Sequence, residues 1–359
     1  MDDNCIQAPS HLKAIDFFCG GGGMSYGMQA AGVRVIAGID SEKSCQDTYL
    51  ANIQGAKFIN CDVFELSEHK LVEELHVQRN DDNLILIGCS PCQYWSIINT
   101  DKKRSEQSKS LLKEFSRFVQ YLMPGYVVVE NVPGVLRRKK ESGLEAFIDW
   151  LKAHNYIVHF EIHNTHDFGV PQNRKRFTLI ASRIGNEEVS PIKASRKLTV
   201  SDVLGESNGF PKVEAGNIDK SSFKHSVANV TPVTLRRLKK VSKDGGDRLG
   251  FADDPDLQLP CFIGKDNSFK DTFGRLWWDK PSPTITTKFY SVSNGRFVHP
   301  DENRALSLRE GATLQSFPKS FEFHGSSMET IARQIGNAVP PEYSRRIALA
   351  IIENSNGKL

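Results

Sequence analysis

The residue best suited to nucleophilic chemistry is a cysteine that follows a short apolar run. Residues 84–87 are all apolar, Gly88 comes after them, and Cys92 stands next to Pro91. An apolar run bounded by glycine and proline is typical of a buried strand that ends in a turn. The sequence therefore predicts a thiol at a strand end, where Cys92 could act as a nucleophile. Because Cys89 lies three residues earlier, a redox Cys-x-x-Cys motif is an alternative.

A carboxylate and two arginines could assist such a thiol. Glu130 follows the β-branched run 127–129 and precedes a Pro-Gly turn. There it could donate or accept a proton, although a salt bridge or a helix cap would also explain an isolated glutamate. Arg174 and Arg176 are two apart in an extended segment, so their side chains should project to the same side. They could bind phosphate or a carbonyl oxygen, or they could form a solvated basic edge.

A glycine-rich turn predicts a site for a nucleotide-type cofactor. Residues 14–18 read as a buried strand, and four glycines, 20–23, follow closely. The dinucleotide fingerprint needs a further spaced glycine, but Ser25 stands there, so a cofactor without a pyrophosphate, such as S-adenosylmethionine, is favoured. Asp40 and Asp62 end the next two strands and could accept hydrogen bonds from ribose hydroxyls and an adenine amino group. The alternative is a plain strand-to-helix turn with aspartate helix caps.

Three histidines raise the question of a metal site. His159 and His163 lie on the polar face of an expected strand with Glu161 between them, and His166 follows. A solvated strand face gives the same pattern, and none of the usual Cys-Cys or His-Glu-x-x-His spacings accompanies it. We therefore expect no metal.

The elements that must position these residues alternate between strand and helix. The expected strands are 14–18, 33–39, 57–59, 84–87, 126–129, 156–163 and 177–181. The expected helices are 24–31, 44–52, 110–122 and 144–154, with another after the proline pair at 340–341. This rhythm predicts an α/β fold with a mainly parallel sheet, whose ligands lie at the carboxyl ends of the strands. A polar loop at 97–109 could close over a substrate.

Composition sets outer limits on the protein. A chain of 359 residues is long enough for one large core and a smaller second unit. The net charge of +3 neither requires nor excludes a polyanionic partner. Seven irregularly spaced cysteines and the lack of a signal peptide indicate free thiols in a cytoplasmic protein. No apolar run approaches the ~20 residues that span a bilayer, so no membrane partner is expected.

The second unit is expected where the strand–helix rhythm stops. Residues 186–274 are rich in Gly, Ser, Asp and Lys and contain only short apolar pieces. Basic side chains cluster there, at Arg236, Arg237, Lys239, Lys240, Lys243 and Arg248. This local basicity suits contacts with phosphate groups.

Taken in order, the motifs resemble those of the DNA cytosine-5 methyltransferase family along most of the chain outside about 186–270. They are Asp16-Phe17-Phe18-Cys19-Gly20-Gly21-Gly22-Gly23, Asp40, Asp62, Pro91-Cys92-Gln93, Glu130-Asn131-Val132, Gln172-Asn173-Arg174-Lys175-Arg176, Arg275 with Pro283-Thr284-Ile285-Thr286, Arg309-Glu310 and Gln334-Ile335-Gly336-Asn337-Ala338-Val339-Pro340. The resemblance implies a Rossmann-like large domain that binds S-adenosylmethionine, at residues 1–185. It further implies a loop-rich target-recognition domain at 186–324 and a C-terminal segment, 325–359, that returns to the large domain.

The resemblance also implies roles for individual residues. Cys92 would add to carbon 6 of a cytosine flipped out of double-stranded DNA, and Glu130 would hold nitrogen 3 and the exocyclic amine. Arg174 and Arg176 would hold the ring carbonyl, the backbone or the loop near the thiol. The residues implied for S-adenosylmethionine are Asp16, Phe18, Gly20, Gly22, Asp40, Asp62, Val63, Pro91, Leu111, Asn337 and Val339.

The expected protein is thus a monomeric bacterial modification enzyme, with a cognate restriction endonuclease as a further partner. One rival is the transfer-RNA branch of the same family, which has a Pro-Pro-Cys-Gln-Pro-Phe-Thr segment where this chain has residues 90–96, Ser-Pro-Cys-Gln-Tyr-Trp-Ser. A thiol redox enzyme and a catalytically silent DNA-binding protein are the other rivals. The last of these would leave Cys92 and Glu130 without a role.

Overall fold

The computed structural model describes residues 10–90, 102–265 and 267–357, with side chains from residue 110 onward in the second range. Two compact units make up the chain. The large unit contains the chain up to residue 168, residues 175–194 and the segment from residue 339. The small unit contains residues 169–174 and 195–338. The domain boundaries were expected at 185/186 and 324/325, and they stay a prediction. The chain passes from one compact unit to the other at 194/195 and 338/339.

The large unit is built on a seven-stranded sheet with the order β3-β2-β1-β4-β5-β7-β6. Its strands are β1 (Lys13–Phe17), β2 (Arg34–Asp40), β3 (Lys57–Asn60), β4 (Leu84–Gly88), β5 (Tyr126–Asn131), β6 (Ile157–Asn164) and β7 (Lys175–Ser182). The five strands from β3 to β5 are mutually parallel, whereas β7 is antiparallel to both of its neighbours. The connection from β6 to β7 spans only residues 165–174, which is too short for a parallel crossover. The expected α/β fold with a mainly parallel sheet is confirmed.

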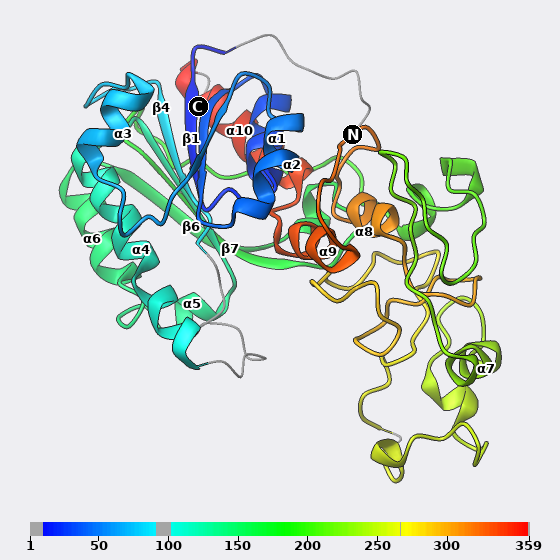
Figure 1. The fold of residues 1–359 in the computed structure, drawn as a ribbon. Coiled ribbons are helices and arrows are strands. Elements are labelled where there is room, and N and C mark those ends of the chain that lie inside the picture. Colours follow the sequence, from blue (N-terminus) through cyan, green and yellow to red (C-terminus); the bar gives the residue numbers. More distant parts are fainter. Residues whose placement is uncertain (1–9, 91–101, 266, 358–359) are drawn as a thin grey trace. The chain divides into compact units, whose positions relative to one another are not determined.

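Helices cover both faces of this sheet (Figure 1). One face carries α1 (Gly23–Ala30) and α10 (Pro341–Ser355), and the other carries α3 (Glu68–Leu75), α4 (Lys102–Leu122) and α6 (Leu144–Ala153). On the second face, apolar side chains of β1, β4, β5 and β7 form one core with those of the three helices. The shorter helices of this unit are η1 (Lys43–Cys45), α2 (Gln46–Asn52), α5 (Gly134–Arg137) and η2 (Thr165–Phe168).

The start of one predicted helix was wrong. The segment expected to be a loop up to residue 109 is helical from Lys102, because α4 spans Lys102–Leu122. Residues 102–109 have no apolar period, but Lys, Arg, Glu and Gln propagate a helix well once a packed segment has nucleated it. The helix expected after the proline pair is confirmed as α10, which begins at Pro341. The helix before it, α9 (Met328–Asn337), was not predicted.

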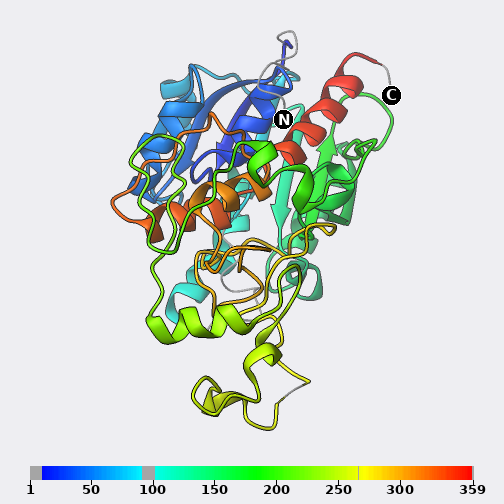
Figure 2. The same cartoon turned by 90° about the vertical axis from the view of Figure 1, so that its right-hand side faces the viewer.

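The small unit has few regular elements, and these are helices. They are η3 (Val200–Asp202), η4 (Glu206–Asn208), α7 (Pro232–Lys240), η5 (Arg248–Phe251), η6 (Pro260–Phe262), α8 (Leu308–Leu314) and α9. Figure 2 shows long loops between them, with α7 in yellow-green. A small apolar core includes Leu238 of α7, Phe251, Leu257, Phe273 and Val298. The expected loop-rich character of this region of the chain is confirmed.

Buried arginines stabilise these loops. Arg275 is 1% exposed and donates hydrogen bonds to the backbone carbonyls of Leu238, Val241, His299 and Glu302. Arg309 is fully buried and donates in the same way to Ser222, Phe223, Pro318 and Phe321. Buried carbonyls outside helices and sheets need donors, and the guanidinium supplies five. Each of these arginines therefore replaces several ladder hydrogen bonds that a sheet would supply.

Over the described ranges, no helix combines the length and the apolar character that crossing a lipid bilayer requires.

Candidate active site

The glycine turn after β1 leaves open space at the carboxyl edge of the sheet. Gly20 has a φ of 52°, and a Cβ atom built on it would meet nothing within 4 Å. Its N–H donates to Asp40 Oδ2 at 2.8 Å, and Asp40 Oδ1 accepts from the N–H of Glu42 at 2.8 Å. Asp40 thus ties the turns after β1 and β2 together. Burial raises the pKa of this half-buried carboxyl.

Gly22 and Phe18 fix the geometry of the same turn. Gly22 is the N-cap of α1 with a φ of 93°, and a Cβ there would lie 3.1–3.2 Å from carbon atoms of Ile53 and Tyr49. Glycine is favoured here by both the left-handed backbone and the close packing. Phe18 has a φ of 61° and donates its N–H to Ile39 O at 2.8 Å, so the chain turns sharply as it leaves β1.

Asp16 lies beneath this turn and is completely enclosed. Its Oδ2 accepts a 2.6 Å hydrogen bond from Ser25 Oγ, which also lies 3.0 Å from Tyr49 Oη. Burial raises the pKa of Asp16 to about 7; the nearby Asp40 adds to the rise, and Ser25 opposes it. Asp16 Oδ1 is buried and has no hydrogen-bond partner among the described residues. Asp16 therefore supports the turn from inside the large unit.

The turn after β3 contains two further expected cofactor residues. Asp62 is exposed, and its Oδ1 accepts from the N–H of Phe64 at 3.1 Å. Val63 is 4% exposed and belongs to the core, against which Leu111 of α4 also packs. Arg117 of α4 donates to the carbonyl of Val63 at 2.7 Å, which links this turn to the helix.

These residues fit a nucleoside-type cofactor. The open space at Gly20 allows close approach of a ligand to the backbone, while Asp40 and the exposed Asp62 keep lone pairs for hydroxyl or amino groups. All three lie at carboxyl ends of neighbouring parallel strands, the usual ligand position in such sheets. Asn337 is the exposed last residue of α9 in the small unit, and Val339 is buried in the large unit.

Glu130 and Arg176 form an ion pair at the ends of β5 and β7. Arg176 Nε lies 2.9 Å from Glu130 Oε1, and the two side chains are 12% and 6% exposed. Arg176 also donates to the carbonyl of Lys175. A nearly buried carboxylate needs such a partner, since burial of an unpaired charge is costly. Because β5 and β7 run in opposite directions, the end of one strand meets the start of the other.

Asn131 and Ser90 are functional candidates to which the sequence reasoning gave no role. Asn131 Nδ2 donates to Ser90 Oγ at 3.1 Å, and both side chains are buried. Asn131 Oδ1 accepts from the N–H of Val132 at 2.8 Å. Asn131 therefore anchors the chain at Ser90, directly before Pro91 and Cys92. The signal available in the sequence was an amide residue directly after the strand-end carboxylate.

The described hydrogen bonds of Arg174 go to other groups than those of Arg176. Arg174 is 3% exposed and donates to the carbonyls of Ile285, Gly336 and Ala338, all in the small unit. Arg174 precedes β7, whereas Arg176 lies within it. The roles expected for the two arginines stay a prediction, and the contacts of Arg174 with backbone carbonyls are one of the options given for it. Arg176 contacts a proposed catalytic side chain, Glu130.

Cys92 and Pro91 lie outside the described residues, as does the start of the loop expected at 97–109. The chain can be followed through β4 as far as Ser90. Gly88 pairs with Phe17 of β1 and Val129 of β5, so β4 lies between the strands that end at the glycine turn and at Glu130. Cys89, directly after β4, is a half-buried thiol.

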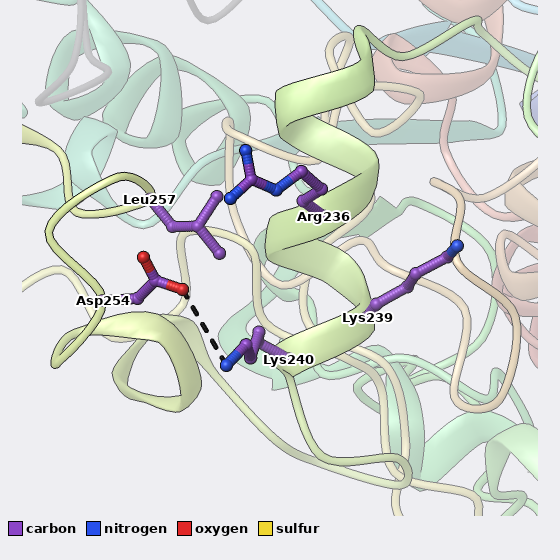
Figure 3. Close-up of a pocket in the computed structure, with 5 residues that line it drawn as sticks. All are labelled: Arg236, Lys239, Lys240, Asp254 and Leu257. Carbon is purple, nitrogen blue, oxygen red and sulfur yellow. Dashed lines mark ion pairs between the residues drawn. The ribbon is translucent and has the colours of Figure 1, made fainter.

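A basic pocket lies on α7 in the small unit. Arg236, Lys239 and Lys240 line it together with Asp254 and Leu257 (Figure 3). Lys240 Nζ lies 3.8 Å from Asp254 Oδ2, and the three basic side chains are exposed. Four members of the basic cluster expected from the sequence, Arg236, Arg237, Lys239 and Lys240, therefore belong to a single helix.

Two proteins similar to this chain are bacterial methylases. The chain is 36% identical over 344 residues to the type II methylase M.HgiDII of Herpetosiphon aurantiacus, covering 94% of each protein. It is 32% identical over 349 residues to the type II methyltransferase M1.HphI of Haemophilus parahaemolyticus, covering 96% of this chain and 88% of that protein.

A similar fold occurs in a solved structure of a candidate DNA modification methyltransferase encoded within an Escherichia coli prophage. The TM-score is 0.74 at 22% identity, and the match covers 96% of this chain and 99% of the other. The family model described as C-5 cytosine-specific DNA methylase matches residues 12–353, which include both units and every motif discussed above. This chain therefore belongs to the C-5 cytosine-specific DNA methylase family.

Proposed function

We propose that this DNA cytosine-5 methyltransferase is the modification enzyme of a type II restriction–modification system and that Cys92 and Glu130 perform its chemistry. Its relatives are type II methylases, which favours DNA over transfer RNA as the substrate. The observation that carries the assignment of residues is the Glu130–Arg176 ion pair at the end of β5, beside the strand that leads to Cys92.

Carbon 5 of cytosine is a weak nucleophile, so the ring must first gain electron density. The thiolate of Cys92 adds to carbon 6, and the resulting enamine makes carbon 5 nucleophilic enough to accept a methyl group. Loss of the proton from carbon 5 then expels Cys92 and restores the aromatic ring. The target base is stacked inside duplex DNA, so it must be flipped out before the thiolate can reach it.

Glu130 supplies the proton or hydrogen bond at ring nitrogen 3 and holds the exocyclic amine, which favours the addition at carbon 6. Arg176 positions Glu130 through the 2.9 Å ion pair. Asn131 positions the segment that contains Cys92 through its hydrogen bond to Ser90. Arg174 holds backbone carbonyls of the small unit through its guanidinium.

S-Adenosylmethionine, when bound, supplies a methyl group on a positively charged sulfur. Asp40 and Asp62 bind its polar groups, Gly20 allows close approach to the backbone, and Gly22 and Asp16 hold the shape of the turn. Phe18, Val63 and Leu111 supply apolar contact. Pro91, Asn337 and Val339 complete the set of proposed cofactor residues. The methyl transfer itself requires no metal ion.

The small unit recognises the target DNA sequence, and the basic face of α7 contacts phosphate groups. We further propose that the enzyme is a monomer in the cytoplasm, where its DNA substrate and a cognate restriction endonuclease would be found. Side chains of the loops in the small unit determine which DNA sequence is recognised.

The test is methyl transfer to duplex DNA from tritium-labelled S-adenosylmethionine, with the Cys92→Ser variant beside the wild type. We expect the wild type to label DNA, the variant to be inactive, and a duplex containing 5-fluorocytosine to trap a covalent adduct at Cys92. Undiminished activity of Cys92→Ser would overturn the assignment of Cys92 as the nucleophile. If only transfer RNA were labelled, the substrate would be transfer RNA and not DNA. Bisulfite sequencing of DNA from a host that expresses the enzyme would identify the DNA sequence that it methylates.

A further inference from the structure

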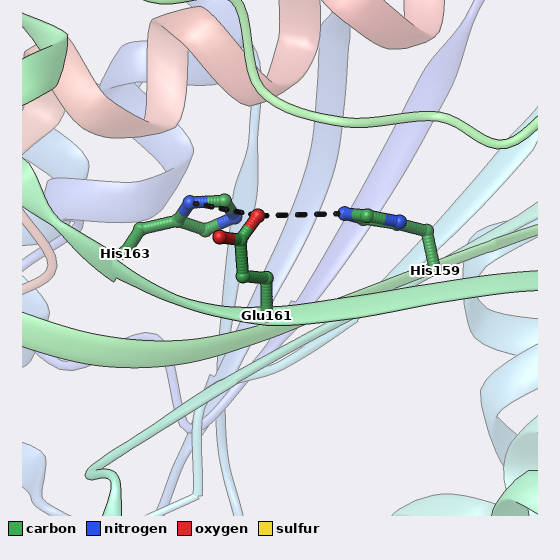
Figure 4. Close-up of side chains that lie close together, drawn as sticks. All are labelled: His159, Glu161 and His163. Atoms are coloured by element: carbon green, nitrogen blue, oxygen red, sulfur yellow. Dashed lines mark ion pairs between the residues drawn. The ribbon is translucent and has the colours of Figure 1, made fainter.

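Three potential metal ligands lie side by side on the edge strand of the sheet, and the methyl-transfer chemistry uses none of them. His159, Glu161 and His163 alternate along β6, so their side chains share one face of the strand (Figure 4). Glu161 Oε2 lies 3.9 Å from His159 Nε2 and 3.8 Å from His163 Nδ1. One ligand atom from each of the three residues lies within 4.8 Å of the other two.

The orientation of His159 suits a metal ligand. Its Nδ1 lies 2.8 Å from Glu188 Oε2, so Nδ1 carries the proton and donates it to this carboxylate. The lone pair is then on Nε2, the atom that faces Glu161. Nε2 is buried and makes no hydrogen bond to any described residue. A histidine that donates one ring N–H to a carboxylate while the other nitrogen ligates a cation is the usual arrangement at metal sites.

His163 is held rigidly on the other side of Glu161. Its side chain is 6% exposed, and the ring packs edge-on against Phe168 with centroids 5.1 Å apart. Its Nδ1 faces the Glu161 carboxylate, which is 61% exposed and therefore able to adjust. Zinc bonds to nitrogen and oxygen are about 2.0–2.2 Å long, so tetrahedral ligand atoms lie about 3.4 Å apart. The ligand atoms lie within 4.8 Å of one another, so cation binding requires the exposed Glu161 to move toward both histidines and the His159 ring to rotate inward.

We propose that His159, Glu161 and His163 bind one zinc-type divalent cation, with Glu188 orienting His159. Two imidazoles and one carboxylate suit zinc, nickel or copper rather than magnesium, which prefers oxygen ligands. The three protein ligands leave a fourth position for water. This proposal departs from the expectation, drawn from residue spacing, that the protein holds no metal.

The bound cation stabilises the edge of the sheet. Glu188 lies beyond the end of β7, so the His159–Glu188 hydrogen bond connects β6 to the segment that follows its neighbour. In the register of these strands, His163 is opposite Arg176, the partner of Glu130. A cation fixed at His163 therefore orders the portion of β6 that pairs with the start of β7.

The test is isothermal titration of the metal-free full-length protein with zinc chloride, with magnesium chloride as the comparison. We expect one equivalent of zinc with a micromolar or tighter Kd, a rise in Tm of several degrees, and no binding of magnesium. The His159→Gln variant should weaken zinc binding at least 100-fold, and Glu188→Gln about 10-fold. His154→Gln is the matched control, since this exposed histidine lies outside the cluster.

Free cysteines are the competing zinc ligands, and cobalt separates the two cases. Co²⁺ bound by the histidine cluster should give an absorption spectrum without thiolate charge-transfer bands. The His159→Gln variant should not show this Co²⁺ spectrum. Zinc binding that is undiminished in His159→Gln, or the absence of binding up to millimolar zinc, would overturn the proposal. Methyl-transfer activity of His159→Gln should match the wild type, which shows that the variant is folded.

Discussion

At the scale of single residues, the structure assigns a partner to the carboxylate that the sequence singled out. Glu130 is nearly buried and pairs with Arg176 across two antiparallel strands. Such a pair keeps the carboxylate fixed in position at the strand end, where Asn131 also anchors Ser90. A salt bridge was the alternative to a catalytic role for Glu130, and the two interpretations are compatible because the arginine can orient a group that acts on the substrate.

We predict that Arg176→Lys lowers kcat of DNA methylation about 10- to 100-fold while the protein stays folded. Lysine keeps the charge but lacks the planar guanidinium whose Nε lies 2.9 Å from Glu130. Steady-state kinetics should show an effect on kcat larger than that on KM for DNA. The control is Arg183→Lys, since Arg183 pairs with an exposed Asp82 and should change kcat less than twofold. Equal rates for the two variants would contradict the positioning role.

Asp16 connects stability to pH, because its pKa of about 7 in the folded protein exceeds the ordinary aspartate value. A carboxyl with a raised pKa stabilises the fold below its unfolded-state pKa, near 4. That contribution is lost as the pH rises through 7, since the folded state then has to hold a buried charge.

We therefore predict that Asp16→Asn removes part of the pH dependence of stability. The free energy of unfolding of the variant, relative to wild type, should rise by about 2 kcal/mol between pH 5.5 and 7.5. Urea denaturation at several pH values measures it. Parallel pH curves for the two proteins would show that Asp16 keeps an ordinary pKa.

At the scale of elements, α8 shows how the small unit holds a helix among loops. Glu310 forms a capping box with Ser307 and a bidentate ion pair with Arg304, at 2.7 and 2.8 Å. Burial would raise the pKa of Glu310, but Arg304 and the other hydrogen-bond donors lower it to about 2. This lowered pKa stabilises the fold above about pH 4.5, and the stabilisation is lost as the pH falls toward 2.

We predict that Glu310→Ala destabilises the protein by about 3 kcal/mol at pH 7, because the buried Arg304 loses its bidentate partner and keeps only Glu302, and because the capping box of α8 is lost. Urea unfolding followed by tryptophan fluorescence measures the loss. As the pH falls from 4.5 to 3, the free energy of unfolding should decrease less steeply for Glu310→Gln than for wild type. Glu329→Ala is the control, since its ion pair with Lys288 lies at the surface and its removal should have little effect. A loss for Glu310→Ala as small as that of the control would contradict the prediction.

At the scale of the whole molecule, the charge distribution is more informative than the net charge. The formal charge of +3 over 359 residues says little about a polyanionic partner. The exposed basic side chains on α7, Arg236, Lys239 and Lys240, concentrate positive charge in the unit proposed to recognise DNA. Contacts between such side chains and phosphates release counterions, so they strengthen binding at low salt.

We predict that the double variant Arg236→Ala/Lys239→Ala weakens binding to duplex DNA at least 10-fold at 0.1 M salt. The slope of log Kd against log salt concentration should also decrease by about 2, which corresponds to the loss of two ionic contacts. Fluorescence anisotropy over a salt series measures both quantities. Lys152→Ala, on the exposed face of α6, should leave them unchanged. A salt slope equal to that of wild type would place the phosphate contacts elsewhere.

The sequence by itself determined the family, the alternation of strands and helices, and the placement of Asp40, Asp62 and Glu130 at or directly after strand ends. These features depend on local patterns: apolar runs, glycine and proline punctuation, and motifs of a few residues. The extent of α4 was missed because its polar first turns lack an apolar period.

The tertiary structure alone decided which distant groups meet. It paired Arg176 with Glu130, directed Arg174 to carbonyls of the small unit, linked Asn131 to Ser90 and brought Glu188 to His159. Each contact depends on strand order, on the reversed direction of β7 and on loop paths. No local sequence pattern specifies these, since they arise when the whole sheet and its helices pack together.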